Sequence, residues 1–105
     1  MPFKIGNVKI TNNLILAPMT KINDLPFRML CKENGAGLVY TEMINSNAIT
    51  RNNKSAIRMS RTIEEEKPVA IQIFGARKDL ISEAAKILEP NADILDFNLG
   101  LNSYI

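Results

Sequence analysis

The 105-residue sequence contains no histidine, a single cysteine and no apolar run long enough to cross a membrane. Without histidine, acid–base chemistry would need another residue type. The lone Cys31 excludes an internal disulfide and is typical of a reducing cytosol. Its position within an apolar helix pattern indicates a core residue rather than a catalytic thiol. The start of the chain lacks a secretory signal, so we expect a cytoplasmic protein with no membrane contact.

Composition and charge place the chain among ordinary globular proteins. Hydrophobic residues make up 46% of it, and the formal net charge is only +2. That charge is too small to indicate nucleic-acid binding by itself. The length allows one domain at most, and we expect no metal site.

Hydrophobic periodicity predicts an alternation of strands and helices. We predict a hairpin around Gly6-Asn7, strands over 14–19, 37–43, 67–75 and 92–100, helices over 24–35 and 78–90, and a helical or loop-rich segment over 46–60. Such an alternation predicts a parallel sheet with crossover helices. Four units fit a small open α/β sheet or half of an eight-stranded barrel. Spacing favours neither, whereas so short a chain favours the open sheet.

Helix faces give a first list of core residues. The helix over 24–35 has Asp24 as its expected N-cap and Gly35 as its stop. We expect Leu25, Met29 and Leu30 to face the core. In the helix over 78–90 one apolar face comprises Leu80, Ile81, Ala84, Ala85 and Leu88.

Polar residues occur near the carboxyl ends of three predicted strands, where active sites of α/β proteins lie. They are Thr41 and Glu42 in the second strand, Gln72 in the third, and Asp96 and Asn98 in the fourth. An amide both donates and accepts hydrogen bonds, so such a set could bind a heteroaromatic ligand. The alternative is that these side chains bond only one another or nearby backbone.

A group of basic residues recurs at helical spacing. Arg51, Lys54, Arg58 and Arg61 would form a stripe on one helix. The stripe could hold the phosphates of RNA, because arginine suits bidentate phosphate contacts. The alternative is a solvated face, because the acidic run 64–66 follows closely.

Several motifs together resemble the N-terminal part of the tRNA-dihydrouridine synthases of bacteria and archaea. They are "IGNVKITNNLILAPM", "DLPFRMLCKENGAGLVYTEM", "PVAIQIFG" and "AAKILEPNADILDFNLG", and they cover nearly the whole chain. The resemblance implies a (β/α)₈ barrel, usually followed by a helical domain. It also implies FMN as cofactor, tRNA as substrate and NADPH as the source of hydride. Residues 1–105 would then be a partial FMN-binding barrel domain: an N-terminal hairpin and the first four β/α units.

The resemblance assigns roles to individual residues. Pro18, Met19 and Thr20 would line the flavin with backbone contacts, although the family more often has alanine where Thr20 stands. Gln72 matches the amide that hydrogen-bonds the flavin ring. Asn98 matches the asparagine that opens the N-x-G-C-P motif beside flavin and substrate.

The sequence departs from that motif after Gly100. Leu101 stands where the family has its proton-donating cysteine, and Asn102 stands where it has proline. We therefore assign no catalytic residue and expect a truncation or frameshift product that ends after the fourth strand. Three hypotheses remain open: an inactive fragment, a flavin oxidoreductase whose missing half comes from a partner chain, and a non-enzymatic RNA-binding module. Open sheet edges would also favour self-association.

Overall fold

The chain begins with an antiparallel hairpin. The computed structural model describes residues 2–100. In it β1 (Phe3–Ile5) pairs with β2 (Val8–Ile10). Gly6 in the turn has a φ of 57°, a left-handed conformation that glycine adopts without steric cost. The predicted hairpin is confirmed.

A four-stranded parallel sheet forms the centre of the molecule. Its order is β3 (Ile15–Leu16), β4 (Leu38–Asn45), β5 (Val69–Phe74) and β6 (Ile94–Phe97), which is also their order in the chain. All three neighbouring pairs are parallel. The predicted α/β class with a parallel sheet is confirmed, and the half-barrel stays a prediction.

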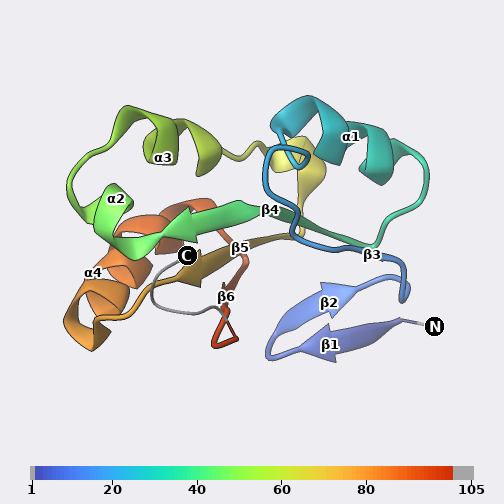
Figure 1. Ribbon diagram of the computed structural model, residues 1–105. Coiled ribbons are helices and arrows are strands. Elements are labelled where there is room, and N and C mark those ends of the chain that lie inside the picture. The colour runs from blue at the N-terminus through green and yellow to red at the C-terminus, as the bar shows by residue number, and fades with distance from the viewer. Residues whose placement is uncertain (1, 101–105) are drawn as a thin grey trace.

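Helices connect the strands and cover one face of the sheet (Figure 1). They are α1 (Leu25–Glu33), α2 (Ser46–Thr50), α3 (Lys54–Met59) and α4 (Lys78–Leu88), with 3₁₀ turns η1 (Glu64–Glu66) and η2 (Glu89–Asn91). Figure 1 also shows the hairpin on the other side of the sheet from α1–α3. No helix within residues 2–100 is long and apolar enough to span a bilayer.

Two groups of buried side chains pack the two faces of the sheet. On the helix side, Ile44, Ile71 and Ile73 meet side chains of α2, α3 and α4. Ala84 and Leu88 of α4 are fully buried, as predicted for that face. On the other face, Ile10 of the hairpin packs with Leu38 and Ala70, so the hairpin covers the end of the sheet where the strands begin.

The first parallel strand is shorter than predicted. Strand β3 spans two residues, whereas the apolar run predicted a strand over 14–19. Proline lacks the N–H that a sheet ladder needs, so Pro18 cannot extend the pairing. The chain instead leaves the sheet and forms a loop that leads to α1.

The predicted core face of α1 is wrong in one respect. Leu30 is 55% exposed, while the charged Arg28 is 2% exposed. Arg28 faces inward because its guanidinium pairs there with the buried carboxylate of Glu66. An apolar-periodicity argument cannot detect such a pair, because it counts arginine as a surface residue.

Candidate functional site

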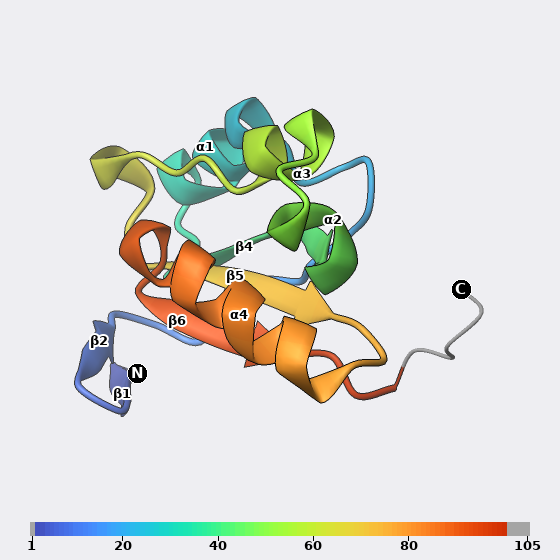
Figure 2. The same ribbon diagram turned by 90° about the vertical axis from the view of Figure 1, so that its left-hand side faces the viewer.

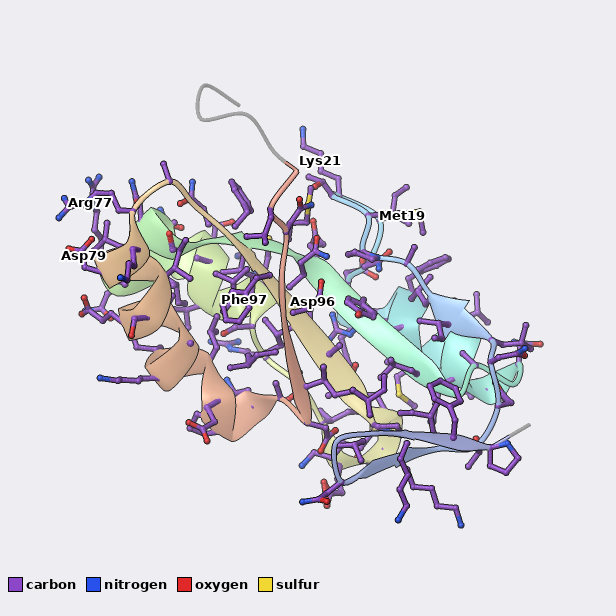
Figure 3. All side chains as sticks on the ribbon, turned by 90° about the horizontal axis from the view of Figure 1, so that it is seen from below. Met19, Lys21, Arg77, Asp79, Asp96 and Phe97 are labelled. Carbon is purple, nitrogen blue, oxygen red and sulfur yellow. The ribbon has the colours of Figure 1, made fainter. Side chains whose placement is uncertain are left out.

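The carboxyl ends of the parallel strands gather the predicted site residues at one edge of the sheet. The loop after β3 and the ends of β4, β5 and β6 all lie at this edge, opposite the hairpin (Figure 2). Strand register places Met43 beside Gln72, and Gln72 beside Asp96. These three side chains therefore share the sheet face that the helices leave uncovered, as Figure 3 shows for Asp96.

Three polar side chains on this face form a hydrogen-bonded row. Gln72 Nε2 donates to Asp96 Oδ2 over 2.6 Å. Asn98 Nδ2 donates to Gln72 Oε1 over 3.3 Å, and the Gly100 N–H donates to Asn98 Oδ1 over 2.9 Å. Gln72 is 8% exposed, so these bonds offset the cost of burying its amide. The alternative that the polar residues bond one another thus describes what the structure shows, and the Gln72 amide still has one hydrogen outside these bonds.

Tyr40 adds a phenol to the same row. The pKa of its hydroxyl is raised, first by burial and then by the charge of Asp96 and a hydrogen bond to that carboxylate. Sequence reasoning did not select Tyr40, because its approach to Asp96, which lies two strands away, is a property of the assembled sheet. Asp96 itself was noted as polar but given no role.

The loop after β3 is held in place by a buried asparagine. Asn23 Nδ2 donates to the carbonyls of Ala17 (2.7 Å) and Tyr40 (2.9 Å). The backbone N–H groups of Ile22 and Asn23 donate to the Met19 carbonyl, which closes a tight turn. Pro18, Met19 and Thr20 are thereby fixed beside the end of β4, and Figure 3 shows Met19 on this loop.

A buried ion pair between Arg28 and Glu66 helps to hold Asn23 in place. Arg28 contacts Glu66 through two bonds, Nε to Oε1 at 2.6 Å and Nη2 to Oε2 at 3.1 Å. Its Nη1 donates to the Asn23 carbonyl over 2.9 Å. Glu66 also accepts from the Ile63 N–H, and it is fully buried. Within the acidic run over 64–66, Glu64 and Glu65 are exposed and Glu66 alone faces the interior.

An irregularity in β4 brings a second carboxylate to the loop. Between Tyr40 and Met43 the register with β5 shifts by one residue. Bulges of this kind change the direction of side chains and occur often beside active sites. Here Glu42 accepts a hydrogen bond from the Lys21 N–H, and Lys21 has a φ of 65°. Glu42 thus helps to fix the same loop.

The four basic residues do not form one helical stripe. Asn52, with a φ of 57°, separates α2 from α3. Arg51 caps α2, and Arg61 lies beyond α3, so the four residues do not share the one helix that a stripe would need. The segment over 46–60, predicted to be helical or loop-rich, forms two short helices joined by a turn. The short polar side chains over 52–53 end one helix and cap the next, because asparagine tolerates left-handed backbone and binds free helix N–H groups.

Only Arg58 and Arg61 of this group reach a common cavity. It measures about 340 Å³ and is lined by Asp24, Leu25, Pro26, Arg28, Glu42, Arg58, Met59 and Arg61. Arg51 and Lys54 lie outside it. Two carboxylates face the same space, so the cavity is not uniformly positive, and its charge does not single out a phosphate ligand.

The structure thus brings Gln72 and Asn98 together and sets the loop 18–20 at the same edge of the sheet. Leu101, predicted to stand at a catalytic position, lies outside the described residues. The site as described offers two oriented amides, a carboxylate and a thioether: Asn98 Nδ2 also contacts Met43 Sδ at 3.4 Å. Such a set suits a planar ligand with donors and acceptors along its edge.

Comparison with known proteins gives a consistent result. The dihydrouridine synthase (Dus) family model matches residues 15–101. The chain is 41% identical over 99 residues to a probable tRNA-dihydrouridine synthase of Rickettsia prowazekii, which covers 92% of this chain and 30% of that protein. It is 42% identical to tRNA-dihydrouridine synthase B of Shigella flexneri, with the same coverage, and 40% identical to that of Pseudomonas syringae. The chain therefore spans about 30% of the length of these relatives.

Proposed function

The chain belongs to the dihydrouridine synthase family, and we propose that it forms the flavin-ring-binding part of a tRNA-dihydrouridine synthase. In this proposal the four strands are the first half of a (β/α)₈ barrel, whose active site lies at the carboxyl edge of the sheet. The hydrogen-bonded amides of Gln72 and Asn98 at this edge carry the proposal, because the resemblance to the family implies flavin contacts for both.

The described residues fit the ring of FMN. Gln72 keeps one amide hydrogen that is not used in the row, and the second amide hydrogen of Asn98 faces only the weak acceptor Met43 Sδ. Both side chains lie at the end of the sheet that the hairpin leaves open. Pro18, Met19 and Thr20 form a rigid loop whose backbone groups could meet a planar edge. FMN would supply hydride transfer to the uracil ring, with NADPH as reductant. These side chains would bind and orient the ring.

We expect a polypeptide of these 105 residues to bind FMN weakly or not at all. Charged contacts to phosphate are the strong ones, and in barrels they commonly come from loops after strands seven and eight. The 105 residues contain the ring contacts but not those strands. Fluorescence titration with FMN tests this, and tight stoichiometric binding would contradict it. Retention of FMN during purification would favour a half completed by a partner chain.

Whether we expect catalysis depends on position 101, where the family has its proton-donating cysteine and this chain has leucine. Leucine has no proton to give, so we expect no dihydrouridine formation from this chain. The test extends the chain with the remaining barrel of a full-length relative, once with Leu101 and once with Leu101→Cys. A positioned general acid contributes roughly 10²–10⁴-fold, so the leucine form should be slower by that factor. Equal rates would show that position 101 does not hold the proton donor.

For the complete synthase we propose tRNA as substrate and the cytoplasm as its location. Arg58 and Arg61 are the members of the basic group best placed to contact RNA, because they share the cavity beside the carboxyl edge. Arg58→Ala should weaken tRNA binding by such an extended protein more than Lys54→Ala does. RNA retention by the 105-residue chain without any flavin would instead favour the non-enzymatic binding module.

A further inference from the structure

Asp96 lies at one end of the hydrogen-bonded row Asp96, Gln72, Asn98, on the sheet face that the helices leave uncovered. We propose that Asp96 is a positioning residue that fixes the orientation of the Gln72 amide, and through it decides which atoms of Gln72 and Asn98 face a bound ring. The inference deepens the proposed flavin function and rests on it only for the identity of the ligand. The role follows from the direction of three hydrogen bonds.

The two ends of the row have fixed polarity. At one end the Gly100 N–H can only donate, so Asn98 presents Oδ1 to it and Nδ2 to Gln72. At the other end an ionised carboxylate can only accept, so Gln72 presents Nε2 to Asp96. The two amides between these ends can then adopt one arrangement that satisfies all three bonds.

Without the Asp96 carboxylate, the orientation of the Gln72 amide would no longer be fixed. The oxygen and nitrogen of a carboxamide have nearly the same size, so a flip changes the hydrogen bonds and not the packing. An asparagine at position 96 could accept from Gln72 in one orientation or donate to it in the other. Asp96 is half-buried and Gln72 is 8% exposed, so water competes little for this bond.

The fixed direction has a consequence for the ligand. Beyond the bonds of the row, Gln72 keeps one Nε2 hydrogen and one lone pair of Oε1, whereas the second Nδ2 hydrogen of Asn98 is directed at Met43 Sδ, a weak acceptor. Gln72 therefore offers a ligand one donor and one acceptor side by side. A ring edge with alternating acceptor and donor atoms matches this pattern, and a flipped Gln72 would present the wrong atom to one of them.

Gln72 is the only glutamine in the sequence, which permits a direct test. Protein labelled with ¹⁵N in the glutamine side chain gives a single carboxamide signal pair in NMR spectra. In the wild-type chain one of its two protons should be shifted downfield by the bond to the carboxylate. In Asp96→Asn that downfield shift should be lost, and in Asp96→Glu it should be recovered in part.

Two further variants make the result decisive. Asp79→Asn removes the same charge from an exposed position on α4 and should leave the signals unchanged. Asn98→Ala should keep the downfield proton, because Asp96 still accepts from Gln72. If folded Asp96→Asn keeps the wild-type signals, the proposal is overturned. Should Asp96→Asn fail to fold, loss of the downfield proton in Asn98→Ala overturns it instead. The signals are recorded without flavin, so a failed FMN titration would count against the proposed function alone.

Discussion

Arg28 shows how one charged residue can organise a small sheet protein. It is 2% exposed and contacts a fully buried Glu66, the Asn23 carbonyl and the Arg61 carbonyl. Through Asn23 it supports the loop 18–20, so the pair links the interior of the helix layer to the proposed flavin site. Burying two charges is costly, and the cost is offset only when every donor and acceptor finds a partner.

We predict that breaking this pair is strongly destabilising. Arg28→Met leaves the Glu66 carboxylate buried without its partner, which typically costs about 3–5 kcal/mol of the free energy of unfolding. The double variant Arg28→Met with Glu66→Leu should recover much of that loss, because no uncompensated charge remains. Urea denaturation measures both. Asp79→Ala, which breaks an exposed pair with Arg77, is the control and should have little effect. Additive losses in the double variant would contradict the prediction.

Tyr40 gives the site a measurable response at alkaline pH. Burial, the charge of Asp96 and the hydrogen bond to it all raise the pKa of the phenol in the folded chain. Its contribution to stability should be complete below the unfolded pKa of about 10 and should be lost as pH rises through the folded value. In a Tyr104→Phe background Tyr40 is the only tyrosine, so phenolate absorbance reports its titration. Asp96→Asn should lower this pKa, and an unchanged titration would show that the two groups do not interact.

At the scale of elements, helix α1 carries its own start signal. Asp24 accepts a hydrogen bond from the Phe27 N–H over 3.0 Å, and Pro26 lies in the first turn. Both features are common at helix N-termini and need no tertiary contact. Helix α4 lacks a side-chain cap and depends on its apolar face, where Ala84 and Leu88 are fully buried.

We therefore predict that Asp24→Ala lowers stability by about 1 kcal/mol. Loss of the cap leaves an N–H of the first turn without its protein partner. Asp24→Asn keeps an acceptor in the same place and should stay close to wild type. Thermal or urea unfolding of the three proteins measures the difference. Equal losses in both variants would mean that the charge of Asp24, not its capping bond, stabilises the helix.

At the scale of the whole molecule, the sheet ends in two free edges. Among residues 2–100 no further strand pairs with the outer sides of β3 and β6. Ile15 on β3 is 45% exposed and Phe97 on β6 is 46% exposed, and neither strand contains lysine or proline. Free, apolar strand edges favour pairing with another chain. A complete barrel would leave no such edge, because closure pairs every strand.

We predict that the isolated chain forms a dimer or larger assemblies rather than a stable monomer. Light scattering across a concentration series measures the mass. Ile15→Lys and Phe97→Lys place a charge on the two edges and should shift the mass toward the monomer. Ile87→Lys changes an exposed apolar residue of α4, away from both edges, and should leave the mass unchanged. A monodisperse wild-type monomer at high concentration would refute the prediction.

Features that depend on neighbours along the chain could be predicted from the residues alone. The Gly6 turn, the Asp24 cap, the apolar face of α4 and the parallel α/β class all follow from local pattern, and so does the family. Pairings between residues far apart in the chain became visible only in the folded molecule. Arg28 and Glu66 are 38 residues apart, and Gln72 and Asp96 are 24 apart. Whether such groups meet depends on strand register and helix rotation, which are set by packing of the whole chain. Local periodicity contains no information on which charged side chain turns inward to meet another.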